Sequence, residues 1–197
     1  MFYQVPARPC NEPPAHPRLS WIDMAHLRPA RFGGSDGDAD LCRSLMREYA
    51  AHLNASVGGE HICVTTLEKE LAALPGPYAE PAGLVLLAFV DNEPAGCVAL
   101  KPVQTEANAA TQAEMKRLWV RPAYQGRGLG RILAQAVLDL ARERGYSAIV
   151  LDTMSRTMQS AYALYLSMGF QHIRGSLDNA AHRPIDVAEM VYLRRDL

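Results

Sequence analysis

Glycines and polar side chains gather at one turn of this chain, Gln125-Gly126-Arg127-Gly128-Leu129-Gly130. A helical pattern follows at once, and the first backbone N–H groups of a helix have no partner inside it. The helix dipole adds partial positive charge at this end, and glycine lets a phosphate approach without a Cβ in the way. Arg127 and Arg131 are near enough to add charge-assisted hydrogen bonds. The turn is therefore suited to hold a pyrophosphate.

Three phosphate-binding patterns place glycines in such a turn. A P-loop needs Gly-Lys-Ser/Thr, whereas here Arg-Ile follows the last glycine. A dinucleotide fingerprint, G-x-G-x-x-G, begins at Gly126 and Gly128 but has Arg131 in its third glycine position. Asp152 does lie about 20 residues on, near where a ribose-binding acid is expected. The spacing Q-x-x-G-x-G, which starts at Gln125, fits in full.

The elements that must position this turn are readable from periodicity. Residues 114–120 read as the strand that enters it, and residues 128–144 as the helix that leaves it. The apolar positions of that helix form one stripe, which is expected to pack on a sheet: Leu129, Ile132, Leu133, Ala136, Val137, Leu140 and Ala141.

Strands and helices are mixed along the rest of the chain. We expect further strands at residues 19–28, 84–90, 95–101, 147–151, 170–174 and 188–193, and helices at 41–53, 65–74 and 157–168. A hairpin precedes strand–helix–strand–helix–strand, which favours an α+β or α/β fold with a mixed sheet.

A second motif lies further along, Ala161-Tyr162-Ala163-Leu164-Tyr165-Leu166-Ser167-Met168-Gly169-Phe170. Together with Q-x-x-G-x-G it resembles the GNAT superfamily of acetyl-CoA-dependent N-acetyltransferases, whose helix end reads A-x-x-L-Y-x-x-x-G-F. The resemblance covers roughly residues 84–175. It implies the GNAT acyltransferase fold, with a mostly antiparallel central sheet flanked by helices, and acetyl-CoA as cosubstrate.

The resemblance also assigns roles along the first motif. The backbone of the strand end would pair with the pantetheine arm of acetyl-CoA, and the turn would hold the pyrophosphate. The cofactor-binding residues expected in this way are Leu118, Trp119, Val120, Gln125, Gly126, Arg127, Gly128, Leu129, Gly130 and Arg131.

Two residues match catalytic positions of the family. Tyr165 would protonate the departing CoA thiolate, because a phenol with a pKa of about 10 can donate to a thiolate whose thiol has a pKa of about 8.5. The competing interpretation is a packed aromatic, which suits the neighbouring Tyr162 better. Glu114 would be the general base, acting through water on the attacking amine. A solvated glutamate at a strand end is its alternative.

One position departs from the family pattern. Relatives often carry Asn three residues before the first Ala of the second motif, whereas this chain has Met158. Ser155 or Gln159 are candidates to replace the cofactor contact that such an Asn makes.

The acceptor is expected to be a primary amine of a small molecule that attacks the thioester directly in a ternary complex. Residues 41–74 and 175–186 would shape its pocket. Arg28 and Arg47 could clamp a carboxylate, or they could be solvated surface arginines. Acetylation of a protein N-terminus or lysine, a non-catalytic acetyl-CoA sensor and a nucleotide-binding oxidoreductase are the alternatives that remain.

The composition of the chain limits the classes of protein to which it can belong. The 197 residues carry 20 basic and 21 acidic side chains, so no nucleic-acid-binding stripe or membrane-surface helix is indicated. Neither a secretory signal nor a membrane span is visible. Cysteines 10, 42, 63 and 97 form no C-x-x-C pair, and His61 near Cys63 does not make a metal site.

These limits predict a cytoplasmic enzyme with reduced thiols and no bound metal. Residues 1–18 hold five prolines and read as a disordered arm, and residues 19–197 as a single domain. The sequence does not determine the oligomeric state, although the resemblance suggests a homodimer.

Overall fold

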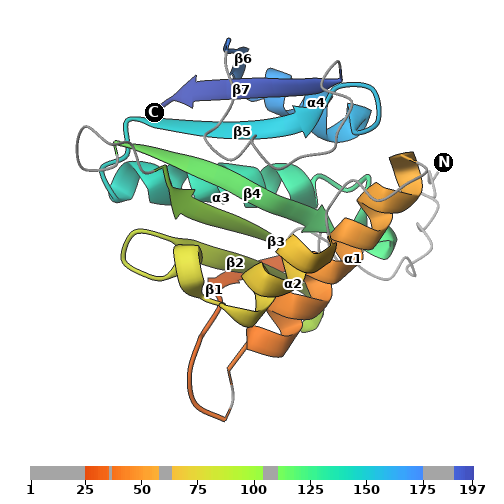
Figure 1. Ribbon diagram of the computed structural model, residues 1–197, viewed down its shortest axis with the longest axis vertical. Coiled ribbons are helices and arrows are strands. Elements are labelled where there is room, and N and C mark those ends of the chain that lie inside the picture. The colour runs from red at the N-terminus through yellow and green to blue at the C-terminus, as the bar shows by residue number, and fades with distance from the viewer. Residues whose placement is uncertain (1–24, 36, 58–63, 104–110, 175–188) are drawn as a thin grey trace, which may run out of the picture.

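A computed structural model describes residues 25–35, 37–57, 64–103, 111–174 and 189–197. Its centre is a seven-stranded sheet in the order β1-β2-β3-β4-β5-β7-β6 (Figure 1). All neighbouring strands are antiparallel except β4 and β5, which are parallel. The strands are β1 (Ala25–Pro29), β2 (Leu84–Val90), β3 (Glu93–Pro102), β4 (Gln112–Val120), β5 (Ala148–Met154), β6 (Gln171–His172) and β7 (Met190–Asp196).

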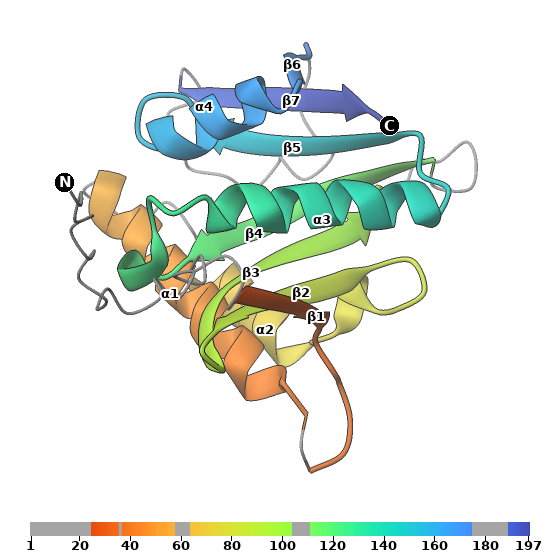
Figure 2. The ribbon, with the colours of Figure 1, turned by 180° about the vertical axis from the view of Figure 1, so that it is seen from behind.

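Helices cover both faces of this sheet. Helices α1 (Ala39–Val57) and α2 (Val64–Ala72) lie on one face, while α3 (Leu129–Glu143) and α4 (Gln159–Ser167) lie on the other (Figures 1 and 2). Strand β2 is buried along its whole length, because its alternate side chains enter both layers. Its Leu86 packs in the cluster of α3, and its Leu87 packs in the cluster of α1 and α2.

The parallel pair β4–β5 is short. Hydrogen-bonded register joins Gln112, Ala113 and Glu114 only to residues 148–150 of β5. Beyond Glu114 the strands diverge, as Figure 1 shows, and β4 keeps its pairing with β3 alone. We call the unpaired stretches, residues 115–120 of β4 and 151–154 of β5, the β4–β5 fork.

Strand β4 also carries a bulge beside the fork. Cys97 of β3 faces Trp119 and Ala99 faces Lys116, so Arg117 and Leu118 together oppose one residue of β3. Arg117 has a φ of 57°, in the left-handed region that non-glycine residues rarely adopt. A bulge bends its strand and increases the local twist, which helps β4 to turn away from β5.

The mixed, mostly antiparallel sheet flanked by helices confirms the expected fold class. Strand β2 has the bounds that the sequence predicted, and the other elements differ by a few residues at their ends. The arm at residues 1–18, the start of the strand expected from residue 19 and the loop at 175–186 lie outside the described residues. Within the described part of the chain, no helix is long and apolar enough to cross a membrane.

A buried ion pair joins β1 to the start of α1. The Arg28 guanidinium donates to both carboxylate oxygens of Asp38, at 2.7 and 2.8 Å, and the Arg31 amide adds a third hydrogen bond. The hydrogen bonds from Arg28 lower the pKa of Asp38 from 3.8 to about 2. A carboxyl whose pKa is lowered by folding stabilises the native state above its ordinary pKa, and this contribution is lost as the pH falls to 2.

We therefore expect Asp38→Asn to lower the free energy of unfolding at pH 7 by about 1–2 kcal/mol, since Arg28 is one-third exposed and partly screened. The difference from wild type should shrink as the pH falls from 4 to 2 in urea denaturation. Asp40→Asn is the control, because Asp40 is exposed and pairs only with Arg43 on its own helix. Equal losses for the two variants at pH 7 would contradict the assignment.

Candidate active site

The glycine turn presents a row of free backbone donors. Gly126 and Gly128 have φ values of 73° and 85°, and a Cβ built at either meets nothing within 4 Å. Helix α3 begins directly afterwards, with Gly128 as its N-cap and no side-chain cap. Among the described residues, no partner accepts from the amides of residues 126–130. These outward-facing donors at a helix N-terminus fit a pyrophosphate.

The turn is held in place from two sides. Gln125 donates from its side-chain amide to the Val120 carbonyl at 2.8 Å, so it ties the turn back to the end of β4. Gly130 lies against Leu164 of α4 and Val120, and a Cβ there would lie 3.7 and 3.9 Å from their side chains. The glutamine and the last glycine of the motif thus position the turn, while the first two glycines leave its outer side open.

The two arginines near the turn differ in their contacts. Arg131 donates to the Ser167 hydroxyl near the end of α4. Arg127 is exposed and has no hydrogen bond or ion pair within the described part of the chain. Both lie at the positive end of α3, so their charge adds to that of the free amides.

Strand β4 leads from the turn into the fork. Leu118 and Val120 pack toward α3, and Trp119 points to the opposite face, where its indole N–H donates to Glu48 of α1. Their side chains therefore belong to the packing of the two layers. On the edge facing β5, the backbone of these residues has no strand partner among the described residues, which leaves it open to an extended ligand.

Tyr165 lies on the buried side of α4, and its hydroxyl has no hydrogen-bond partner among the described residues. Its side chain is 7% exposed and its ring packs edge-on against Phe170, with centroids 5.6 Å apart. Among the described residues nothing forms a hydrogen bond with the phenol. Burial raises its pKa above the ordinary value of 10, and Tyr49 and Asp152 raise it further. Buried polar groups are nearly always paired, so an orphaned phenol indicates a ligand.

The neighbours of Tyr165 locate its hydroxyl. Tyr165 belongs to α4, on the α3 side of the sheet, whereas Tyr49 belongs to α1 on the opposite side (Figure 2). Asp152 lies on the part of β5 that pairs with β7 but no longer with β4. Tyr165 also packs in the same core cluster as Met115 of β4 and Leu151 of β5, which both belong to the fork.

Glu114 lies at the vertex of the fork, opposite Val150 in the last paired position. Its side chain is 5% exposed, and its two oxygens bind Lys101 Nζ and Lys116 Nζ, each at 2.9 Å. The expected alternative of a solvated strand-end glutamate is therefore wrong. As a base, this carboxylate would first have to release one of its two ammonium partners.

The remaining candidates near α4 have structural contacts. Met158 is the N-cap of α4 and its sulfur lies 3.9 Å from the Thr153 hydroxyl. Ser155 contacts the Glu189 carbonyl at 3.4 Å, while Gln159 is exposed at the helix start. Tyr162 bonds to His172 Nε2 at 2.9 Å, which agrees with its interpretation as a packed aromatic.

Several polar contacts near the site were not visible in the sequence. Arg28 and Arg47, considered as a carboxylate clamp, already bind Asp38 and Glu68. Arg117 on the bulge binds Glu70 of α2, 47 residues away. No local pattern connects residues so far apart, so no sequence signal could have identified this pair.

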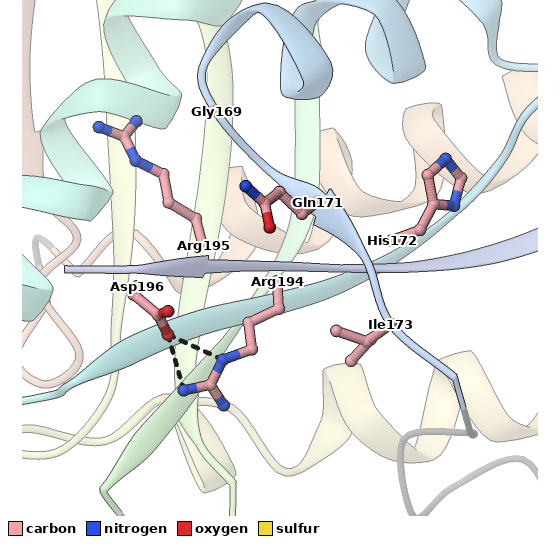
Figure 3. Close-up of a pocket in the computed structure, with 7 residues that line it drawn as sticks. All are labelled: Gly169, Gln171, His172, Ile173, Arg194, Arg195 and Asp196. Carbon is pink, nitrogen blue, oxygen red and sulfur yellow. Dashed lines mark hydrogen bonds and ion pairs between the residues drawn. The ribbon is translucent and has the colours of Figure 1, made fainter.

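A surface depression lies elsewhere, at the outer edge of the sheet (Figure 3). Gln171, His172 and Ile173 line it together with the ion pair of Arg194 and Asp196. Strand β7 separates it from β5 and the fork. None of the residues expected to bind acetyl-CoA or to act in catalysis lines it. The buried thiols of Cys42 and Cys97 are free, and the described residues contain no metal-binding cluster.

Comparison with known proteins agrees with this site. Residues 43–170 match the model of the acetyltransferase (GNAT) family. An uncharacterized N-acetyltransferase of Schizosaccharomyces pombe is 32% identical over 161 residues, which cover 81% of this chain and 89% of that protein. N-acetyltransferase 8F1 of Rattus norvegicus is 36% identical over 107 residues, or 54% of this chain and 48% of that relative. This chain therefore spans about half the length of the rat protein.

Solved structures share the fold. An N-acetyltransferase of Thermoplasma acidophilum, in complex with coenzyme A, has a TM-score of 0.61 at 16% identity, covering 88% of this chain and 99% of that one. A putative acetyltransferase of Salmonella typhimurium, with acetyl-CoA, has a TM-score of 0.59 at 20% identity, covering 88% and 94%. The turn, the fork and these likenesses define an acyltransferase. The chain belongs to the acetyltransferase (GNAT) family.

The open side of the turn gives a direct test. We expect Gly128→Ala to raise the Kd for CoA about tenfold, because a methyl group there enters the space beside the free amides. Gly145→Ala is a matched control at the other end of α3, with a φ of 80° and no atom within 4 Å of an added Cβ. Both variants should lose similar stability, about 1 kcal/mol.

Calorimetry with CoA, and with NAD as the negative ligand, measures the difference between these variants. Equal CoA affinities of the two would show that the turn does not hold the phosphates.

Proposed function

We propose that this protein is an N-acetyltransferase that transfers the acetyl group of acetyl-CoA to a primary amine of a small molecule, directly and in a ternary complex. The observation that carries the proposal is the buried, unpaired phenol of Tyr165 beside the β4–β5 fork. Family membership and the CoA-containing structural neighbours support acetyl-CoA as the donor.

The donor fits the free backbone groups of the site. The pyrophosphate binds the amides of the glycine turn, with Arg127 and Arg131 adding charge. The pantetheine arm continues along the open edge of β4, where it pairs with the backbone of Leu118 to Val120 as an added strand would. This path leads from the exposed turn to the buried fork.

The reaction uses groups on both sides of the fork. The neutral amine attacks the thioester carbonyl, the C–N bond forms and the C–S bond breaks. A backbone amide near Val120 polarises the carbonyl oxygen as negative charge develops there. Tyr165 gives its proton to the CoA sulfur, and the proton lost by the amine passes through water to Glu114. No acetyl-enzyme forms, and burial raises the pKa of Cys97 far above the neutral range, which disfavours it as a nucleophile.

The acceptor enters from the face that carries α1 and α2. On this face the fork is flanked by Tyr49 of α1 and Asp152 of β5. Arg28 and Arg47, which were considered as a clamp for a carboxylate of the acceptor, already bind Asp38 and Glu68. The described residues therefore give no reason to expect a carboxylate on the acceptor. Every candidate acceptor must carry an amine that reaches the buried end of the fork.

Tyr165→Phe tests the acid role. We expect kcat to fall about 100-fold with the KM for acetyl-CoA little changed, because the ring still packs but the proton donor is gone. Since burial raises the phenol pKa above 10, the wild-type enzyme should show no alkaline loss of kcat from this group below pH 10. Release of CoA thiol, measured against an amine library, reports both values.

Tyr162→Phe is the control, because its hydroxyl contacts His172 rather than the fork. A Tyr165→Phe variant with full kcat would assign the phenol to packing, and binding of acetyl-CoA without thiol release for any amine of the library would point to a CoA-binding module.

Glu114→Gln tests the base role. If the carboxylate takes the proton, kcat should fall about 100-fold, because the amine then lacks a group that removes its proton. Lys116→Met is the comparison variant, because it breaks one of the two ion pairs but keeps the carboxylate. Similar losses in the two variants would assign Glu114 to the structure of the fork instead.

A further inference from the structure

A buried ion pair joins the bulge of β4 to helix α2. Arg117 donates from Nε to Glu70 Oε1 at 3.2 Å and from Nη2 to Oε2 at 2.6 Å, a bidentate pair. The Tyr78 hydroxyl donates to the same carboxylate at 2.6 Å. The guanidinium also lies over the ring of Tyr49, 5.9 Å from its centroid.

The pair stays charged although it is buried. The side chains of Arg117 and Glu70 are 13% and 18% exposed. Burial opposes ionisation of Glu70, but the hydrogen bonds and charge of Arg117 outweigh it and leave the pKa of the carboxyl below its ordinary value. Burial likewise opposes the charge of Arg117, and Glu70 outweighs it, so the pKa of the guanidinium is raised.

The backbone at this point is strained. Arg117 has a φ of 57°, and a non-glycine residue in the left-handed region costs of order 1 kcal/mol or more unless its surroundings hold it there. The Arg117 carbonyl accepts a hydrogen bond from the Cys97 thiol, at 3.5 Å. The bidentate pair with Glu70 fixes the side chain of the same residue.

We propose that Glu70 is a positioning residue, which acts through Arg117 to hold the bulge of β4 in the conformation that binds acetyl-CoA. Leu118 is part of the bulge, and Trp119 and Val120 follow it, so the conformation of the bulge sets the direction of the backbone donors and acceptors along the open edge. The inference rests on the proposed path of the pantetheine arm. It extends that path to α2, a helix on the acceptor side of the sheet.

A purely stabilising role is the competing explanation. Buried ion pairs are weak evidence for stability, because desolvation of the charges cancels much of their attraction. Replacement of both partners by apolar side chains is often neutral for folding. If Glu70 positions the bulge, its replacement should lower the affinity for CoA by more than a loss of stability explains.

Glu70→Gln and Glu68→Gln form a matched pair of variants. Both residues lie on α2 and both accept a bidentate guanidinium, Glu68 from Arg47 of α1 at 2.8 and 2.6 Å. The Arg47–Glu68 pair is exposed and joins α2 to α1 rather than to β4. We expect Glu70→Gln to raise the Kd for CoA about tenfold, since small misplacements of binding groups are costly, while Glu68→Gln stays within about twofold of wild type.

Calorimetry on folded protein separates the two explanations, because a loss of stability alone reduces the number of binding sites and leaves Kd unchanged. Glu70→Asp should recover part of the affinity. A Glu70→Gln variant that binds CoA as tightly as Glu68→Gln overturns the proposal.

If Glu70→Gln does not fold, the double variant Glu70→Leu/Arg117→Leu takes its place, with apolar side chains that remove the buried charges together. The proposal predicts weakened CoA binding in this variant, and wild-type affinity overturns it. Equal CoA affinities of Gly128→Ala and Gly145→Ala would instead contradict the proposed CoA site itself. Failure of the Glu70 proposal and failure of the CoA site are therefore distinguishable.

Discussion

The structure depends on one interruption in an otherwise continuous sheet. Strands β4 and β5 pair only as far as Glu114 and Val150 and then separate. A paired strand edge has no free backbone groups, whereas the edge of β4 beyond this point keeps them on a buried surface. In the proposed function this free edge binds the pantetheine arm, so one local loss of pairing serves both the binding of acetyl-CoA and its reaction at Tyr165.

Charged contacts from α1 and α2 hold β4 in this open arrangement. Glu48 of α1 binds Arg121 at 2.7 and 3.0 Å where the strand meets the turn. Glu70 of α2 binds Arg117 at the bulge. Both carboxylates come from helices on the acceptor side and act on the strand expected to bind the donor. If the donor and the acceptor bind as we propose, their two sides are connected through β4, which suits a direct transfer that requires both substrates together.

The two core layers leave little freedom around this strand. Side chains from β2 enter both layers, and Gly96 lets β3 approach β4 so closely that a Cβ would lie 2.4 Å from the Trp119 carbonyl. The antiparallel side of β4 is therefore rigid, while its other edge is free. This asymmetry places conformational adaptation at the fork and at the bulge rather than in the core.

The sequence by itself determined the elements and the local chemistry. Periodicity predicted β2 and α3, and the glycine spacing predicted an open turn at the start of α3, because both depend on residues close together in the chain. Only the tertiary structure decided that Glu114 is enclosed by two lysines, that Arg28 and Arg47 are paired, and that Arg117 meets Glu70. Most of these ion pairs join residues far apart in sequence, and their partners are chosen by sheet order and helix packing, which no local pattern encodes.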